Sequence, residues 1–436
     1  MKTLCIDGYN LALARGTGIA TYGRSLLEAG RSLGFRTEVL FGPDFPRSRS
    51  NLVNEANLVA PASTPIRRSL FEKARRRLER HVGSFGATAW PICTSGEVLW
   101  PETAGGRPDA DAFWACENLF HRAGRTFREH GRSSVVKFDF TSDRPAPDIV
   151  HWTIPLALYA PGRPNVYTIH DLIPLKAPHT TLTDKDAFVA LHNHVARRAD
   201  HIAVVSESTR QDVIKLLGVS PDRVTNTYQT FCLPAAYSSR PINEVASNLE
   251  GIFGLGWKDY FIHFGAIEPK KNLGRLVEAY LSSGSRRPLV VVGGRGWLEA
   301  DETALMRRIL AEDGGENGRI KLYEYLSQST LIDLIRGARA LLFPSLYEGF
   351  GLPVLEAMAL GTAVLTSRSG ALPEVAGNAA VMVEAEDTDA IKEGIRALDA
   401  DDDLIDALSC RGEGQAAKFS AEAYAKRLRD LYSKLD

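Results

Sequence analysis

Two glutamates, Glu348 and Glu356, flank the turn Gly349-Phe350-Gly351-Leu352-Pro353. A strand-like apolar run precedes this turn, and proline favours the first positions of a helix. We therefore predict a helix that runs from Pro353 to Leu360 and ends at Gly361. The free N–H groups and the positive dipole end of such a helix attract a phosphate. Two carboxylates beside a phosphate site favour a ligand with both hydroxyls and phosphates, which is the chemistry of a sugar nucleotide.

Three further candidate ligand-binding groups lie at or after the ends of strand-like runs. Lys271 follows one such run and precedes a helix-like segment, so its ammonium group suits a diphosphate as a compact point charge. His170 ends another run, at the edge where ligands meet an open α/β sheet. Gly16 and Gly18 follow the first strand and let backbone approach a diphosphate or an acceptor. The third glycine of the dinucleotide fingerprint is missing, which counts against a dehydrogenase.

The elements that must position these groups alternate along the chain. Short apolar runs separated by helix-like segments predict parallel strands joined by crossovers. They fall at 4–7, 37–41, 149–152, 165–169, 201–205, 260–264, 288–292, 319–323, 340–343, 363–366 and 380–383. A chain of 436 residues exceeds one ordinary core. The fold class is therefore α/β, with two Rossmann-like, doubly wound domains.

We place the domains at 1–240 and 241–420, with the helix 421–436 returning to the first domain. The interrupted stretch 233–250 is the expected hinge. The stretch 85–147 is rich in Gly, Pro and Trp, and we interpret it as an insertion shaped for an acceptor.

Composition excludes several classes of protein. Apolar content of 44% and charged content of 24% are those of a globular chain, and a net charge of -1 gives no general attraction to nucleic acid. No apolar stretch is long enough to span a bilayer, and the N-terminus lacks a signal-peptide core, so we expect a cytoplasmic protein. Five scattered cysteines indicate neither a disulfide framework nor a zinc site.

Taken together, these motifs resemble those of the retaining GT-B glycosyltransferases of family 4, the mannosyl- and glucosyltransferases of bacterial polysaccharide assembly. The segments that carry the resemblance are the Glu348–Glu356 motif, 265–273 and 168–172. The resemblance is strongest over 260–385 and weaker over 145–215. It implies a GT-B fold, in which the two domains face a central cleft and a C-terminal helix crosses back.

The resemblance also implies residue roles. Glu348 contacts the donor sugar, His170 lies near the sugar and the leaving phosphate, and Lys271 binds the diphosphate. The further donor-binding residues implied are Glu356 on the ribose, Phe350, Gly351 and Leu352 through their N–H groups, and Lys270, Tyr325, Gly265, Arg295 and Gly18. Many members carry an arginine where this chain has Gly265-Ala266-Ile267, and Lys270 or Arg295 is the expected replacement. Tyr325 packs on the nucleobase or is a core aromatic.

The function implied is transfer of a hexose to a saccharide or lipid-linked saccharide acceptor in surface polysaccharide biosynthesis, such as that of lipopolysaccharide, with no obligatory metal cofactor. The run 267–273 favours GDP-mannose as donor, with a UDP-hexose next. A UDP-N-acetylglucosamine 2-epimerase on the same fold, or a non-catalytic sugar-nucleotide-binding protein, stays open as an alternative.

A basic segment at 67–80 suggests a further partner. On a helix, Leu70, Phe71, Ala74 and Leu78 form one apolar stripe, and basic residues occupy the other faces. Such a helix either lies on an anionic membrane surface or packs on its domain with a solvated basic face. The first alternative implies a peripheral position on the inner face of the membrane.

Overall fold

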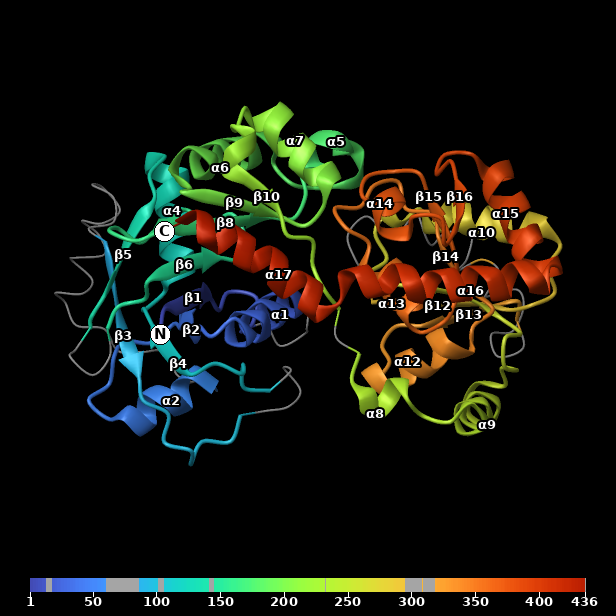
Figure 1. The fold of residues 1–436 in the computed structure, drawn as a ribbon, viewed down its shortest axis with the longest axis horizontal. Coiled ribbons are helices and arrows are strands. Elements are labelled where there is room, and N and C mark those ends of the chain that lie inside the picture. Colours follow the sequence, from blue (N-terminus) through green and yellow to red (C-terminus); the bar gives the residue numbers. More distant parts are fainter. Residues whose placement is uncertain are drawn as a thin grey trace.

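The computed structural model describes residues 1–12, 18–59, 86–100, 106–140, 145–231, 233–294, 308 and 318–435. Within them the chain forms two α/β halves that lie side by side, each built on its own sheet (Figure 1). Arg295 and the basic segment 67–80 lie outside the described residues, as does Gly16.

The first half is built on a sheet of ten described strands in the order β10-β9-β8-β6-β1-β2-β4-β3-β5-β7. These strands are β1 (Thr3–Asp7), β2 (Arg36–Phe41), β3 (Ala87–Ile92), β4 (Ala112–Ala115), β5 (Ser134–Phe138), β6 (Ile149–Trp152), β7 (Leu158–Tyr159), β8 (Asn165–Ile169), β9 (His201–Val204) and β10 (Val224–Asn226). Neighbours pair in parallel, except that β3 is antiparallel to β4. The stretch 85–147 thus supplies three strands of this sheet, β3, β4 and β5.

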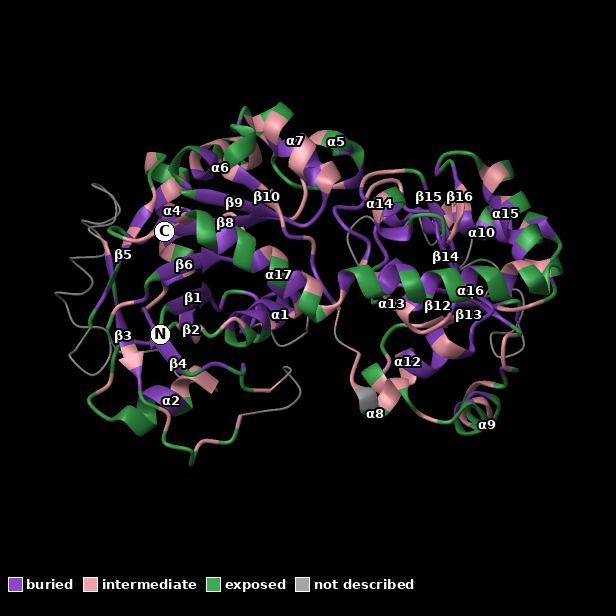
Figure 2. Cartoon of the chain, in the orientation of Figure 1, coloured by how far each residue is buried: buried purple, intermediate pink, exposed green. Residues whose placement is uncertain are grey.

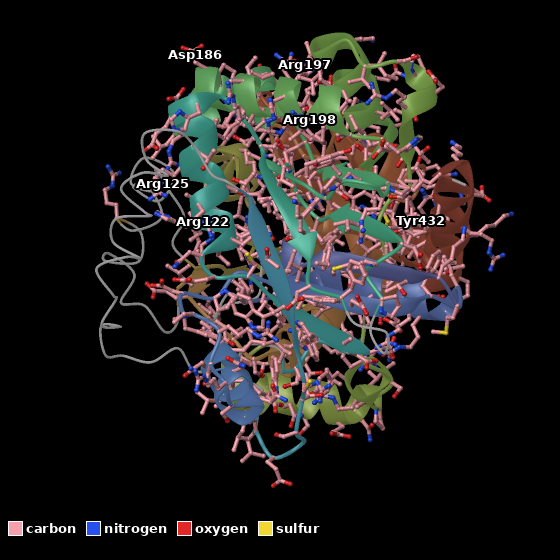
Figure 3. The ribbon with its side chains drawn as sticks, turned by 90° about the vertical axis from the view of Figure 1, so that its left-hand side faces the viewer. Arg122, Arg125, Asp186, Arg197, Arg198 and Tyr432 are labelled. Atoms are coloured by element: carbon pink, nitrogen blue, oxygen red, sulfur yellow. The ribbon has the colours of Figure 1, made fainter. Side chains whose placement is uncertain are left out.

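Helices cover both faces of the first sheet, and their buried sides face inward (Figures 1 and 2). They are α1 (Gly18–Ser32), α2 (Asn51–Val59), α4 (Leu119–His130), α5 (Ile173–Lys176), α6 (Lys185–Arg198) and α7 (Glu207–Leu217). Figure 3 shows Arg122 and Arg125 along α4, and Arg197 and Arg198 at the end of α6, so basic groups gather at the outer end of this half.

The second half has six described strands, all parallel, in the order β13-β12-β11-β14-β15-β16. The strands are β11 (Phe261–Phe264), β12 (Leu289–Val292), β13 (Ile320–Tyr323), β14 (Ala340–Phe343), β15 (Ala363–Ser367) and β16 (Val381–Val383). Its helices are α9 (Ile242–Phe253), α10 (Leu273–Ser283), α12 (Gln328–Gly337), α13 (Leu352–Ala359), α14 (Leu372–Ala376), α15 (Thr388–Ala400) and α16 (Asp402–Ala416). The strands at the centre are buried on both faces, as parallel strands covered by helices must be.

The expected pair of doubly wound domains is confirmed, and so is the returning helix. After α16 the chain crosses back, and α17 (Ala421–Tyr432) packs against α1 of the first half. The stretch 233–250, where the hinge is expected, holds α8 (Ala235–Ser238) and most of α9, and α9 packs on α12, so the hinge stays a prediction. The domain bounds at 240 and 420 stay a prediction.

Candidate functional site

The turn after β14 is built as the sequence predicts, with a small shift. Helix α13 begins at Leu352, one residue before Pro353, and ends at Ala359. Gly351 is the N-cap residue, with a φ of 110° that side chains disfavour. A Cβ there would also lie 2.8 Å from the Leu372 side chain. The backbone can therefore turn sharply and leave the helix N-terminus open to a ligand.

Glu348 and Lys271 come together at the ends of β14 and β11. Lys271 Nζ lies 2.6 Å from Glu348 Oε1, and both residues are buried. Burial disfavours the ionised carboxylate, but the ammonium groups of Lys271 and then Lys270 outweigh it and lower the pKa of Glu348. The two residues therefore form a buried ion pair.

The lysine turn is tied to the glutamate turn by its backbone. Lys270 and Lys271 lie in a short 3-10 turn that ends at Asn272. The Lys270 carbonyl accepts the N–H of Leu346 at 2.7 Å, and the Asn272 side chain donates to the Pro344 carbonyl at 3.0 Å. This places the lysines beside the site from a segment some 75 residues away in sequence.

Lys270 makes a second ion pair. Its Nζ lies 3.3 Å from Glu268 Oε1, and Glu268 is buried. Although burial opposes the charged form, the carboxylates of Glu348 and Glu268 raise the pKa of Lys270. Lys270 thus brings a positive charge near Glu348, and its expected part as the replacement for an arginine stays a prediction.

Glu356 lies on α13, one turn below the helix start, and is half-buried. Within the described part of the chain its carboxylate has no hydrogen-bonding or ionic partner. Burial raises its pKa to about 7. A half-buried carboxylate without a partner is ready to accept hydroxyl hydrogen bonds from a ligand.

The first half meets this site through His170. The His170 Nε2 lies 2.9 Å from the Thr153 carbonyl, and the ring packs edge-on against Tyr22. The His170 carbonyl also approaches Gly349 so closely that a Cβ there would lie 2.4 Å from it. Gly349 is therefore the point where the two halves touch beside Glu348.

Two helix starts also meet at this contact. Gly18 opens α1, and a Cβ on it would lie 3.7 Å from the Leu352 side chain at the start of α13. The start of α1 therefore lies beside the Leu352 side chain at the start of α13.

The structure describes the surroundings of three more of the expected donor-binding residues. Gly265 follows β11 and has a φ of 135°, which side chains disfavour, whereas a Cβ there would meet Lys271 Cε only at an ordinary contact distance of 3.9 Å. Phe350 is buried and packs against Phe419, so only its backbone is available to a ligand. Tyr325 is 82% exposed, which excludes a core role and leaves its ring free in solvent.

Several residues around the site did not stand out in the sequence. The turn after β15 supports Glu348, because Ala371 N–H donates to the Glu348 carbonyl at 3.0 Å and Gly370 passes close to it. Glu374 on α14 accepts the N–H groups of Glu207 and Ser208 at 2.9 and 3.0 Å. This carboxylate caps α7 of the opposite half. The sequence carries a signal here, because Gly370-Ala371-Leu372-Pro373 repeats the glycine–proline pattern of the first turn.

A second bond joins the halves next to Glu348. The Tyr347 hydroxyl donates to Asp212 Oδ2 on α7 at 2.5 Å, and Lys176 Nζ lies 3.0 Å from Asp212 Oδ1. The segment that carries Glu348 is therefore fastened to the other half.

Two hollows open at the same edge of the first sheet, where β1, β2, β4 and β6 end. The larger, of about 570 Å³, lies between α4 and α6 and is mostly apolar. Its walls include Phe120, Phe127, Ile154, Leu156, Phe188 and Leu191. The smaller, of about 360 Å³, has Phe41 and Trp100 in its walls, and Tyr9, Phe120 and His121 line both.

Comparison with known proteins gives matches over both halves. Residues 255–415 match the model of the glycosyl transferases group 1, and residues 104–228 match that of glycosyltransferase family 4. Among curated proteins, the chain is 33% identical over 263 residues to O-antigen chain mannosyltransferase B of Escherichia coli, covering 59% of this chain and 67% of that protein. It is 29% identical over 321 residues to the serotype-specific mannosyltransferase WbdA of E. coli, covering 68% of this chain and only 38% of that protein.

Solved structures match over the whole chain. Sucrose-phosphate synthase from Thermosynechococcus elongatus gives a TM-score of 0.65 at 16% identity, over 100% of this chain and 99% of that one. Anabaena Alr3699/HepE in complex with UDP and glucose gives 0.64 at 15% identity, over 100% of both chains. These likenesses confirm the GT-B fold.

Proposed function

The chain belongs to the family 4 glycosyltransferases, and from that premise we propose that it moves a hexose from a nucleotide sugar to a saccharide hydroxyl, with retention of anomeric configuration. The observation that carries the proposal is the buried Lys271–Glu348 pair, whose glutamate is followed by Gly349 against the His170 carbonyl of the other half. Transfer requires a stabilised leaving diphosphate and an oxocarbenium-like sugar. Two lysines and the start of α13 supply positive potential for the first, and the Glu348 carboxylate supplies negative potential for the second.

For the donor we propose GDP-mannose, with a UDP-hexose as the second candidate. Two E. coli relatives carry the name mannosyltransferase, which supports the sugar. Glu356 supports a nucleoside on the α13 side, because its free carboxylate can accept from ribose hydroxyls. Tyr325 is exposed and has room to stack on a base.

For the acceptor we propose a saccharide, free or lipid-linked, that enters the hollows of the first half. Binding sites for small molecules are concave, with apolar and aromatic walls and a few polar groups, and these hollows fit that description. Tyr9, Phe120 and His121 line both hollows and could contact an acceptor that spans them. The name of one relative, O-antigen chain mannosyltransferase B, supports a role in surface polysaccharide assembly.

We also propose a cytoplasmic enzyme that lies against the inner face of the membrane. No helix among the described residues is long and apolar enough to cross a bilayer. The basic residues at the outer end of the first half, Arg122, Arg125, Arg197 and Arg198, favour an anionic lipid surface. Sedimentation with anionic and with neutral vesicles tests this, and equal recovery with both would rule out the charge-based attachment.

A donor panel tests the proposed function. The purified protein is incubated with GDP- and UDP-sugars, with and without a mannose-containing acceptor, and nucleotide release and melting temperature are followed. A true donor raises the melting temperature, since it binds only the folded state. We expect GDP release that depends on the acceptor. Conversion of a UDP-sugar without acceptor would instead indicate the epimerase, and binding without turnover a non-catalytic protein.

A further inference from the structure

Asn272 lies at the start of α10, directly after the turn that carries Lys270 and Lys271. An asparagine in front of a helix ordinarily accepts an N–H of the first helical turn with its side-chain oxygen. Here the side chain makes no such bond, and the backbone of Asn272 is left-handed, with a φ of 61° and a ψ of 33°. Asparagine tolerates this conformation better than most residues, but few residues adopt it. Such exceptions cluster at functional sites, where the surrounding structure holds them in place.

In place of the cap, the side-chain amide of Asn272 joins three segments of the second half. Its Nδ2 donates to the Pro344 carbonyl at 3.0 Å, just after β14, and to the Ala385 carbonyl at 2.6 Å, after β16. Its Oδ1 accepts from Arg275 Nη1 on α10 at 2.7 Å. An amide nitrogen carries two hydrogens, so both donors are used. Asn272 is buried, which strengthens these bonds because water is excluded from them.

These bonds hold the backbone that carries the two lysines. On one side, the Lys270 carbonyl accepts the N–H of Leu346 at 2.7 Å. On the other side, the Asn272 amide donates to Pro344. Leu346 and Pro344 lie two and four residues before Glu348. The lysine turn is therefore attached on both sides to the segment that leads to Glu348.

The ammonium group of Lys271 is constrained from two further directions. Its Nζ lies 2.6 Å from Glu348 Oε1 and 4.8 Å from the centroid of the Phe343 ring. Lysine has a long, flexible stem, so the position of the ammonium group depends on where the backbone starts. A shift of the lysine turn would therefore move the ammonium group or break one of these contacts.

We propose that Asn272 is the positioning residue for Lys270 and Lys271, and that its amide holds their turn so that both ammonium groups face the diphosphate of the donor. Asn272 itself touches no ligand in this arrangement. Its replacement should therefore weaken the binding of a diphosphate and leave the binding of the nucleoside unchanged. The proposal rests on the function proposed above, since it concerns the nucleotide diphosphate of that reaction.

Asn272→Gly tests the side chain alone, because glycine adopts the left-handed backbone freely. We expect the affinity for GDP to fall roughly tenfold, the scale of one or two lost hydrogen bonds, and the affinity for guanosine to stay within about twofold. If the donor panel selects UDP, then UDP and uridine are the pair to compare. A merely structural role lowers both affinities alike. Equal losses for nucleotide and nucleoside, or no loss for either, would overturn the proposal.

Asn272→Asp tests the two donated bonds. The aspartate keeps an acceptor for Arg275, but it has no N–H for the Pro344 and Ala385 carbonyls. We expect it to lose at least as much GDP affinity as the glycine variant. Parent-like affinity for GDP in Asn272→Asp would show that the donated bonds do not place the lysines, and the proposal would then be wrong.

Asn118→Gly is the matched control. Asn118 also precedes a helix, α4, with a left-handed φ of 52° and no cap bond, but its Nδ2 has no hydrogen-bond partner among the described residues. The variant should match the parent in its affinity for GDP. A loss equal to that of Asn272→Gly would show a general effect of replacing a left-handed asparagine and would overturn the proposal.

Nitrogen-15 NMR of lysine-labelled protein tests the placement without a ligand, with Lys271→Met to assign the signal. We expect the ammonium signal of Lys271 to shift in Asn272→Gly and to stay in place in Asn118→Gly. An unchanged signal in Asn272→Gly would overturn the proposal. Because this measurement needs no donor, a parent protein that binds neither GDP nor UDP would contradict the proposed function and leave this test valid.

Discussion

The ammonium nitrogen of Lys271 lies 2.6 Å from a carboxylate oxygen of Glu348, and both side chains are buried. The lysine comes from the turn after β11 and the glutamate from the turn after β14, two neighbouring strands of one sheet. The resemblance to family 4 assigned them to different parts of the donor. In the structure each supplies the counter-charge of the other, so replacing either one also changes its partner.

Lys271→Ala should therefore lower the free energy of unfolding as well as activity. Removing one member of a buried ion pair leaves an unpaired charge and costs about 3 kcal/mol or more. Lys270 stays nearby and limits the loss. We expect the double variant Lys271→Met/Glu348→Gln to unfold at higher urea concentration than Lys271→Ala, because it buries no unpaired charge.

The matched control for this prediction is Lys392→Ala. Lys392 pairs with Asp389, whose side chain is 83% exposed, so its loss should cost less than about 1 kcal/mol. Equal destabilisation by Lys271→Ala and Lys392→Ala would show that the buried Lys271–Glu348 pair contributes no more to the free energy of unfolding than an exposed pair does.

On activity, Lys271→Ala should weaken nucleotide diphosphate binding, whereas Glu348→Ala should lower kcat more than donor affinity. The lysine faces a charge that is present throughout, but the glutamate meets a positive charge that develops only in the transition state. Titration with GDP and steady-state kinetics separate the two effects. Unchanged rates in both variants would defeat the assignment of the site.

Glu356 should make stability depend on pH near neutrality. Its pKa is raised to about 7 in the folded protein from an ordinary value of 4.5. The stabilisation that its proton provides is complete below pH 4.5 and is lost as the pH rises through 7. Glu356→Gln cannot ionise, so at pH 8 it should be more stable than the parent by about 1–2 kcal/mol. Urea unfolding at pH 5 and pH 8 measures this, and an equal difference at both pH values would contradict it.

Gly349→Ala should block the approach of the two halves. A Cβ at this position would lie 2.4 Å from the His170 carbonyl and 2.8 Å from Asp171 Cβ. We expect a large fall in kcat and a larger radius of gyration by small-angle scattering, with nucleotide binding retained by the second half. Gly414→Ala is the control, since a Cβ there meets nothing within 4 Å, and it should match the parent in both measurements.

Glu374 should hold the two halves together through its hydrogen bonds to α7. Its two oxygens accept the first N–H groups of α7, a bond type strengthened by the helix dipole. Glu374→Ala removes both bonds and should raise the donor KM several-fold and expand the molecule in scattering. Glu393→Ala, which alters an exposed carboxylate of α15, is the comparison. A Glu374→Ala enzyme with parent-like KM and scattering would show that the contact does not hold the halves together.

Local patterns in the sequence were sufficient for most of the fold. Five strands of the first sheet, the six described strands of the second and the helix that starts at the Gly351–Pro353 turn follow from runs of a few apolar residues, from glycine and from proline, whereas β3, β4, β5, β7 and β10 were not predicted. These signals lie within single helices and strands, so they can be read from the sequence without knowledge of the tertiary structure. The stretch 233–250 shows the limit of local patterns, because its prolines and serines do not indicate that α9 packs on α12.

The sequence by itself determined the two α/β halves and the motif residues Glu348, Lys271, His170 and Glu356. Only the tertiary structure decided that Lys271 and Glu348 are paired and that Glu374 caps α7. The partners in these contacts are separated by 77 to 167 positions along the chain, as in the Lys271–Glu348 and Glu207–Glu374 bonds. A side chain's charge and hydrogen bonds depend on what lies within a few ångströms, and that distance is set by the packing of sheets and helices, which no local pattern of residues encodes.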